Sequence, residues 1–220
     1  MRSQRFTSVL LAPVLGVLVA LAPLPAGAGA QVEEQLAPSV VTVLSQAISD
    51  RPVPADYANL PEHRAWLADM SRRLAPKMPD AGSREDFLAT VHYEATRAGL
   101  DPQLVLSVIQ HESAFRKYAV SSAGARGYMQ VMPFWTNLIG AAGHNLFHLR
   151  TNLRYGCVIL RHYLDVEGGD LYRALGRYNG SLGRPEYPTA VLAVQNRNWQ
   201  FPPAGAPTKL GAAPAQTAVR

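Results

Sequence analysis

The chain has 220 residues, with 21 lysines and arginines against 16 aspartates and glutamates, a formal net charge of +5 and one cysteine. A single cysteine excludes an internal disulfide framework. The mild basic excess suits a loose attraction to an anionic polymer, but without a cluster of lysines and arginines it argues against a nucleic-acid partner.

Residues 1–30 have the pattern of a secretory signal peptide. Two arginines precede an apolar stretch, and the segment ends in the small residues Ala28-Gly29-Ala30. A membrane anchor is the competing interpretation, but about 20 consecutive apolar residues are needed to span a bilayer, and prolines interrupt this stretch. We therefore expect export to the periplasm or beyond, no stable membrane anchor, and a mature chain that begins near Gln31.

Residues 31–82 are expected to form an accessory or linker segment. Their helical periodicity is partial and is broken by prolines, until Trp66, Met70 and Leu74 recur at fourfold spacing and predict an amphipathic helix over 62–74. No pattern of chemical groups marks this segment.

Clearer helix signals begin at Ser83, which forms a capping-box pattern with Asp86, and Gly99 suits the position just beyond the end of this helix. Asp101 followed by Pro102 predicts the start of another helix, because aspartate favours the N-cap and proline the first helical position. Leu104, Val105, Val108 and Ile109 give this helix an apolar face, and it ends near Glu112.

Four more helices are predicted downstream, around 133–139, 151–167, 170–178 and 186–195. No alternating strand pattern competes with them, so the fold class is mainly α. Residues 201–220, rich in alanine and proline with little to bury, are expected to be a disordered tail.

Glu112 is the first candidate for chemistry. A carboxylate withdrawn from water without a partner costs free energy unless its pKa rises and it binds a proton. A protonated carboxyl group beside a leaving oxygen is what general acid catalysis of glycosidic cleavage requires. Spacing alone, however, favours an ordinary solvated glutamate at a helix end.

The surrounding residues add a family resemblance. His111-Glu112-Ser113 is followed by the string Ala-Val-Ser-Ser-Ala-Gly-Ala-Arg-Gly-Tyr-Met-Gln-Val-Met-Pro over 119–133, and later by Tyr178-Asn179-Gly180 and by Tyr187. Together these blocks resemble the lytic transglycosylase SLT domain over about residues 84–195. The resemblance implies a lysozyme-like helical catalytic domain, here bounded at 83–200, that acts on peptidoglycan.

By this resemblance Glu112 is the catalytic acid and base. Ser113 would hold the substrate or the carboxyl group, and the Tyr187 hydroxyl would orient Glu112. A lone serine at a helix end is otherwise more often a cap, so only the joint pattern supports its role.

The same resemblance assigns Met129 and Gln130 to the wall of a glycan cleft, Tyr178 to substrate binding, and Asn179 to the acetamido group of the sugar. Amides and hydroxyls are suited to sugar groups, and methionine or aromatic walls to ring faces. Met129 is also interpretable as a core residue, and Asn179 beside Gly180 as a turn residue.

Departures from the family pattern occur at Tyr128, where leucine is usual, at Arg177, where alanine is usual, and over residues 180–183. Tyr128 is interpretable either as a stacking surface for a sugar or as a core residue with its hydroxyl at the edge. Arg177 could meet a carboxylate of a peptide stem or lie on a solvated helix face.

We predict neither a metal nor another cofactor. His111-Glu112 begins a zinc-protease motif, but Phe115 occupies the place of the second histidine, and His144 with His148 lacks further ligands. Ser113 lies in no nucleophile elbow. Cys157, surrounded by apolar residues, is expected to be buried and inert.

The matching blocks contain no second acid, although most glycosidases use two. The resemblance therefore implies a lytic transglycosylase that cleaves between N-acetylmuramic acid and N-acetylglucosamine and leaves a 1,6-anhydro sugar. One alternative is a goose-type-lysozyme-like hydrolase, with a water positioned by one of the acids near helix ends: Asp165, Glu167, Asp170 or Glu186. Another is a non-catalytic, cell-wall-binding component of an envelope apparatus, whose protein partners the sequence does not identify.

Overall fold

The computed structural model describes residues 30–49, 52–141 and 143–201. The expected signal peptide, apart from Ala30, and the expected tail, apart from Phe201, lie outside these residues. The described residues form eight α-helices and no β-strand beyond isolated bridges, which confirms the mainly α class. The helices are α1 (Pro38–Ile48), α2 (Pro61–Leu74), α3 (Ala81–Arg97), α4 (Pro102–Ser113), α5 (Phe134–Ile139), α6 (Leu149–Val166), α7 (Leu171–Asn179) and α8 (Glu186–Val194). A short 3₁₀-helix (Tyr57–Asn59) precedes α2, and a π-helix (Gln195–Trp199) follows α8.

The caps of α3 and α4 follow local sequence signals, with one correction. The capping box predicted at Ser83 is wrong, because α3 begins two residues earlier and the Asp80 carboxylate accepts the Ser83 backbone N–H at 2.8 Å. An aspartate side chain at the N-cap satisfies an amide that the helix leaves free. Asp101 caps α4 as predicted, by accepting the Gln103 backbone N–H at 2.9 Å.

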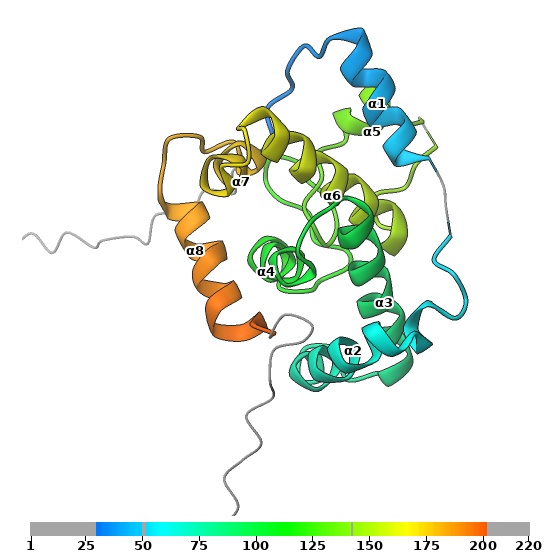
Figure 1. Cartoon of the computed structure of the whole chain (residues 1–220). Coiled ribbons are helices and arrows are strands. Elements are labelled where there is room, and N and C mark those ends of the chain that lie inside the picture. The colour runs from blue at the N-terminus through cyan, green and yellow to red at the C-terminus, as the bar shows by residue number, and fades with distance from the viewer. Residues whose placement is uncertain (1–29, 50–51, 142, 202–220) are drawn as a thin grey trace, which may run out of the picture.

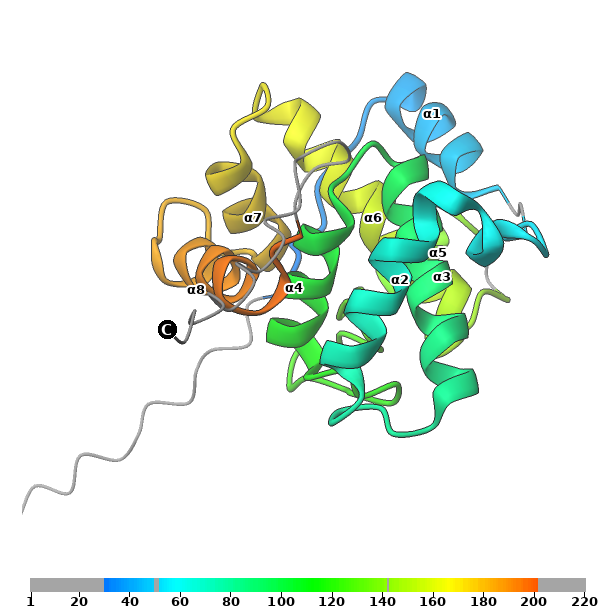
Figure 2. The same cartoon turned by 60° about the horizontal axis from the view of Figure 1, so that its bottom comes forward.

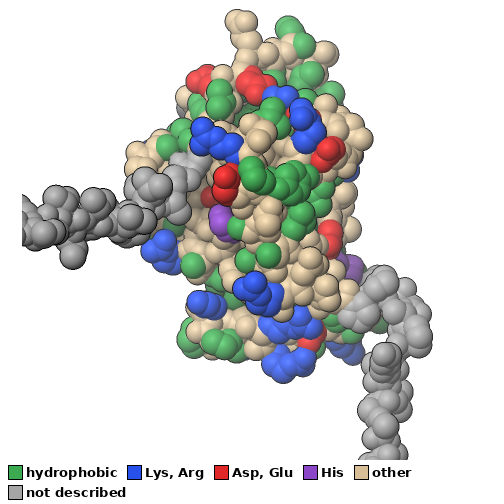
Figure 3. All heavy atoms as spheres, turned by 90° about the vertical axis from the view of Figure 1, so that its left-hand side faces the viewer, with side chains coloured by type: hydrophobic (Ala, Val, Ile, Leu, Met, Phe, Trp, Pro, Cys, Tyr) green, Lys and Arg blue, Asp and Glu red, His purple; other side chains and the backbone are tan. Residues whose placement is uncertain are grey.

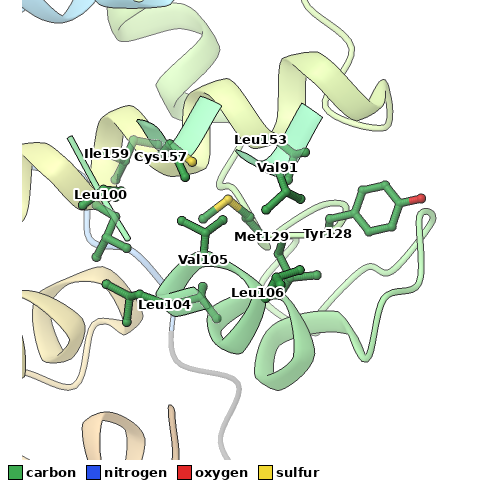
Figure 4. Close-up of a cluster of buried hydrophobic side chains, with 14 of the residues drawn as sticks. Val91, Leu100, Leu104, Val105, Leu106, Tyr128, Met129, Leu153, Cys157 and Ile159 are labelled. Carbon is green, nitrogen blue, oxygen red and sulfur yellow. The ribbon is translucent and has the colours of Figure 1, made fainter. Parts of the chain in front are cut away.

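Helix α4 runs through the middle of the molecule, between α3 on one side and α8 on the other (Figure 1). Its apolar residues from Leu104 to Ile109 are at most 3% exposed. Figure 4 shows Val105 and Leu106 of α4 near Met129, together with side chains of α3 and α6. Burial of this size holds the C-terminal end of α4, and Glu112 with it, in a fixed place.

Helices α1 and α2 pack against the same core as the helices that follow them. Leu44 and Ile48 of α1, and Trp66, Met70 and Leu74 of α2, are buried in it. Figure 2 shows α2 lying along α3. No helix in the described part of the chain has the length and hydropathy needed to cross a bilayer.

Candidate active site

The chain turns sharply just after Glu112. Ala114 and Phe115 both adopt left-handed backbone conformations, with φ of 48° and 65°, which end α4. Such angles are unfavourable for residues with a side chain, and packing holds them here. The Phe115 ring lies edge-on against Phe87 at 6.0 Å and Trp199 at 5.6 Å, measured between ring centroids.

The Glu112 carboxyl group accepts a hydrogen bond from the Tyr187 hydroxyl, with 2.6 Å between the two oxygens. Burial raises the pKa of Glu112 from 4.5 to about 7, and the hydrogen bond from Tyr187 opposes this rise without cancelling it. No charged group of the described residues contributes to the shift. Glu112 is therefore a lone carboxyl group that can carry or release a proton near neutral pH.

Tyr187 is itself fixed from two sides. It lies in the first turn of α8 and is 5% exposed. The His111 ring packs against it at right angles, with centroids 4.9 Å apart. Burial, and then the neighbouring Glu112 charge, raise the pKa of the Tyr187 hydroxyl well above its usual range, so it stays a donor. The structure thus brings together the two residues that the sequence analysis pairs.

A second part of the site is the loop from 119 to 132, which is fastened by Asn152 of α6. The fully buried Asn152 side chain accepts the Met129 backbone N–H at 2.8 Å and donates to the carbonyls of Arg126 and Leu146 at 2.8 and 2.9 Å. A Cβ atom at Gly127, where φ is 76°, would come within 2.4 Å of the Asn152 amide. Glycine is therefore required where the loop passes α6.

Gln130 is 7% exposed and has a left-handed backbone, with φ of 49°. Its side-chain amide donates to the carbonyls of Gly127 at 2.9 Å and Ala119 at 3.1 Å, so the side chain spans the loop from inside. Met129 is fully buried, and its sulfur packs where Gly156 of α6 leaves room. In this structure the Met129 side chain is part of the core. Its backbone carbonyl, not its side chain, accepts a hydrogen bond from a neighbouring residue, Tyr178.

Tyr178 connects this loop to α7. Its hydroxyl donates to the Met129 carbonyl at 2.7 Å, and the side chain is 1% exposed. Burial raises its pKa well above the usual range, and the Glu112 charge is the next cause. Glu112, Tyr178 and the loop are therefore near neighbours, although they come from three separate segments of the chain.

Ser113 and Asn179 differ in their surroundings. The Ser113 hydroxyl is buried and donates back to the Ile109 carbonyl at 3.0 Å, a bond within α4. Asn179 ends α7 and is 8% exposed, and its side-chain amide forms no hydrogen bond to another described residue. Of these two side chains, Asn179 is the one with free polar groups for a ligand.

Three of the four acids considered as water-activating partners are engaged elsewhere, and the fourth, Glu186, is exposed. Glu167 pairs with Arg173 and Arg177 at 2.5 and 2.6 Å, and Asp165 pairs with Arg161. Asp170 caps α7, while Glu186 is exposed in the first turn of α8. No other carboxylate of the described residues is among the causes of the raised pKa of Glu112.

Two departures from the family pattern now have structural explanations. Tyr128 is 7% exposed, and its ring packs 5.0 Å from that of Phe87 between centroids, which favours the core interpretation. In Figure 4 its hydroxyl points away from the Met129 cluster. Arg177 meets carboxylates of this chain, since it bonds both Glu167 and Glu34, the latter at 3.1 Å.

The remaining candidates lie outside this arrangement. His144 hydrogen-bonds the Tyr155 hydroxyl at 2.6 Å, and no group of three or more potential ligands occurs in the described part. Cys157 is buried, and burial raises its thiol pKa. A groove of about 680 Å³ between α1, α3 and α6 is lined by Asp165 but by none of the site residues that the family resemblance implies.

The sequence analysis missed three features. These are the role of Asn152 in holding the loop, the packing of His111 on Tyr187, and the hydrogen bond from the Gln31 side chain to the Gln130 carbonyl. An asparagine within an apolar helix was the available signal for Asn152, because a buried amide must find partners. The other two contacts join residues far apart in the chain or on different helices, and no local pattern predicts them.

The face that carries α7 and α8 shows lysine and arginine side chains spread among a few acidic ones (Figure 3). The lysine and arginine side chains are more frequent in the lower part of this view and the acidic ones in its upper part, while the net charge of the chain is a mild +5. Attraction to an anionic polymer would therefore be weak and dependent on salt.

In comparisons with known proteins, residues 89–188 match the model of a family described as "Transglycosylase SLT domain". The transglycosylase of Enterobacteria phage PRD1 is 33% identical over 98 residues, which are 44% of this chain and 36% of that protein. The membrane-bound lytic murein transglycosylase C of Mannheimia succiniciproducens is 39% identical over 64 residues, or 29% of this chain and 16% of that protein. Thus the chain matches well under half of either relative's length.

Among solved structures, an inactive mutant of the lytic transglycosylase Slt from Pseudomonas aeruginosa is similar with a TM-score of 0.41 and 22% identity, over 70% of this chain and 31% of that one. The family match includes Glu112, the 119–132 loop and the end of α7, and it ends one residue after Tyr187.

Proposed function

We propose, from the premise that residues 89–188 belong to the transglycosylase SLT family, that this protein is a peptidoglycan lytic transglycosylase with Glu112 as its one catalytic carboxyl group. The observation that carries the proposal is the lone Glu112 carboxyl group, with a pKa near 7 and a hydrogen bond from Tyr187. Such a group can act as an acid in one step and as a base in the next.

In the first step, protonated Glu112 donates its proton to the oxygen that joins C1 of N-acetylmuramic acid to C4 of N-acetylglucosamine. The C1–O4 bond breaks with its electron pair going to O4, so the leaving sugar departs with a neutral hydroxyl group and C1 is left electron-deficient, with the character of an oxocarbenium ion. With a pKa raised to about 7, a substantial part of the enzyme holds this proton at neutral pH. Tyr187 keeps the carboxyl group in one orientation and stabilises the carboxylate that the step leaves behind.

In the second step, the Glu112 carboxylate takes the proton of the muramoyl C6 hydroxyl as O6 bonds to C1. The product is a 1,6-anhydro sugar, the acid is regenerated, and no water is consumed. Because O6 belongs to the same sugar as C1, its effective concentration exceeds that of a separate nucleophile when the ring is held in the right shape. This route needs no second carboxylate.

We propose that the Asn179 amide supplies hydrogen bonds to the sugar. It lies next to Tyr178, whose near neighbours are Met129 and Glu112, and its own polar atoms have no partner among the described residues. Gln130 and Met129 act indirectly, by holding the 119–132 loop in its shape. Action on the cell wall agrees with the proposed export of the chain through residues 1–30.

The test is digestion of purified sacculi by the parent protein and by Glu112→Gln, which keeps the side-chain shape and removes the acid. We expect the rate of solubilisation to fall about 10²–10⁴-fold, the usual cost of losing general acid catalysis. Glu85→Gln makes the same change at an exposed position of α3 and should match the parent.

Folded Glu112→Gln protein that digests sacculi at the parental rate would contradict the assignment. A parent that binds sacculi without releasing any fragments would favour the non-catalytic alternative.

A further inference from the structure

The residues that precede α1 lie against the candidate active site. Residues 30–36, which we call the N-terminal strap, form no helix or strand. Within the strap Gln31 is 5% exposed, while the next four residues are exposed. A buried glutamine in an otherwise exposed segment indicates a specific contact, because its amide must find partners.

The Gln31 side chain holds the backbone on both sides of Val131. Its amide nitrogen donates to the Gln130 carbonyl at 3.3 Å, and its amide oxygen accepts the Met132 backbone N–H at 3.1 Å. The side chain thus replaces a strand partner for this part of the loop. Since Gln130 has a left-handed backbone, the two bonds fasten the loop where its conformation is least favourable.

The same side chain lies close to the Tyr178 hydroxyl, because it is one of the groups that act on the pKa of Tyr178, in the lowering direction. Tyr178 in turn donates to the Met129 carbonyl. Gln31 therefore sits between the loop and the end of α7, the two segments that flank Glu112. The strap continues past Gly180, where a Cβ atom would lie 2.0 Å from the Ala30 carbonyl oxygen.

Charged side chains hold the segment from Gln31 to the end of α1 at two places. Glu34 pairs with Arg177 at 3.1 Å, and Arg177 pairs with Glu167. At the far end, Arg97 donates to the Ala47 carbonyl, and buried Arg154 donates to the Ile48 carbonyl at 3.5 Å. These contacts keep the strap in place without using any residue of the active site.

We propose that Gln31 is a positioning residue for the active site, which acts by holding the Gln130–Met132 backbone and Tyr178 in register. This inference rests on the proposed function. It concerns a residue outside the family match at 89–188, so this site is completed by the chain's own N-terminal segment. The contacts that carry it are those of the Gln31 side chain.

The experiment compares Gln31→Met, Gln31→Glu and the parent in the full chain, with Gln35→Met as the matched control on an exposed strap residue. Methionine fills the space of glutamine without its hydrogen bonds. Glutamate retains both bonds only when protonated, since a carboxylic acid can donate and accept while a carboxylate can only accept. Rates and KM are measured on a soluble glycan strand from pH 4.5 to 8, where circular dichroism shows each variant fully folded.

We expect Gln31→Met to lower kcat/KM about 10-fold to 100-fold at every pH, because small displacements of substrate-positioning groups cost rates of this size. The kcat/KM of Gln31→Glu should approach that of the parent near pH 4.5 and fall below it as pH rises. If Gln31 had a merely structural role, its replacement would lower the melting temperature. The kcat/KM of folded Gln31→Met and the pH profile of folded Gln31→Glu would then equal those of the parent.

Parental kcat/KM in folded Gln31→Met, or a parental pH profile in Gln31→Glu, would overturn the inference. These outcomes are distinguishable from failure of the proposed function, in which the parent itself would not cleave the glycan strand.

Discussion

Replacing Glu112 by glutamine should stabilise the folded protein at neutral pH while it lowers the catalytic rate. Burial raises the pKa of Glu112 from 4.5 to about 7, so the folded state binds a proton more tightly than the unfolded state does. The free energy of unfolding therefore falls as pH rises from about 4.5 to about 7, and it stays lowered above that window. A glutamine side chain is neutral throughout and pays no such penalty.

The size of the effect follows from the two pKa values. The difference between 7 and 4.5, at 1.36 kcal/mol per pH unit, gives an upper bound of about 3 kcal/mol at pH 8. The glutamine amide oxygen can still accept the hydrogen bond from Tyr187, so little is lost in exchange. Below pH 4.5 both side chains are neutral, and the two proteins should have nearly equal stability.

Urea denaturation followed by circular dichroism between pH 4 and pH 8 measures this difference. Glu85→Gln serves as the control, since the side chain it replaces is exposed. The stability gap between Glu112→Gln and the parent should open with rising pH, and the control should show no such trend. A gap that is independent of pH, or that favours the parent at pH 8, would refute burial as the cause of the raised pKa.

Two further substitutions test the surroundings of Glu112. Tyr187→Phe removes the hydrogen bond that lowers the pKa of Glu112, so the alkaline limb of the kcat/KM profile should move to higher pH while the maximum falls; a limb that moves to lower pH would contradict this role. Asn152→Ala leaves the Met129 N–H and two carbonyls without their buried partner, so it should cost about 2–4 kcal/mol in urea denaturation. A loss below about 0.5 kcal/mol, the usual range for a surface change, would show that the loop does not depend on Asn152.

Local signals in the sequence predicted the helical frame well. The Asp101-Pro102 start of α4 and the glycines after α3 and α6 mark ends that backbone chemistry dictates, and the structure has them there. The error at Ser83 arose because two capping patterns overlap, and the earlier aspartate, Asp80, provides the N-cap. Such choices depend on a few tenths of a kcal/mol and are hard to make from sequence.

The candidate site was predicted less completely than the frame. The family pattern named Glu112 and Tyr187, and the structure places them in contact. The pattern gave no means to tell side chains that face a ligand from those that support the loop, so Met129 and Asn179 were treated alike. Their burial and hydrogen bonds separate them: Met129 is in the core, while the Asn179 amide is free of partners within the described residues.

Contacts between distant segments that the family pattern does not include could not be predicted at all. Gln31 meets Gln130 across 99 positions of the chain, and Arg177 meets Glu34 across 143. The sequence suggested only an accessory or linker segment for this N-terminal region, because a strap held by single side chains has no periodic pattern.

The mass of the released product tests the central claim most directly, namely that one carboxyl group acts as both acid and base. Muropeptides from sacculi digested by the parent protein are separated and weighed by mass spectrometry. The mechanism with Glu112 as the lone acid predicts muropeptides that end in 1,6-anhydro-N-acetylmuramic acid, lighter by one water than hydrolysed ones and without a reducing end. Predominantly reducing-end muropeptides would contradict the account and require a second group that activates water opposite Glu112.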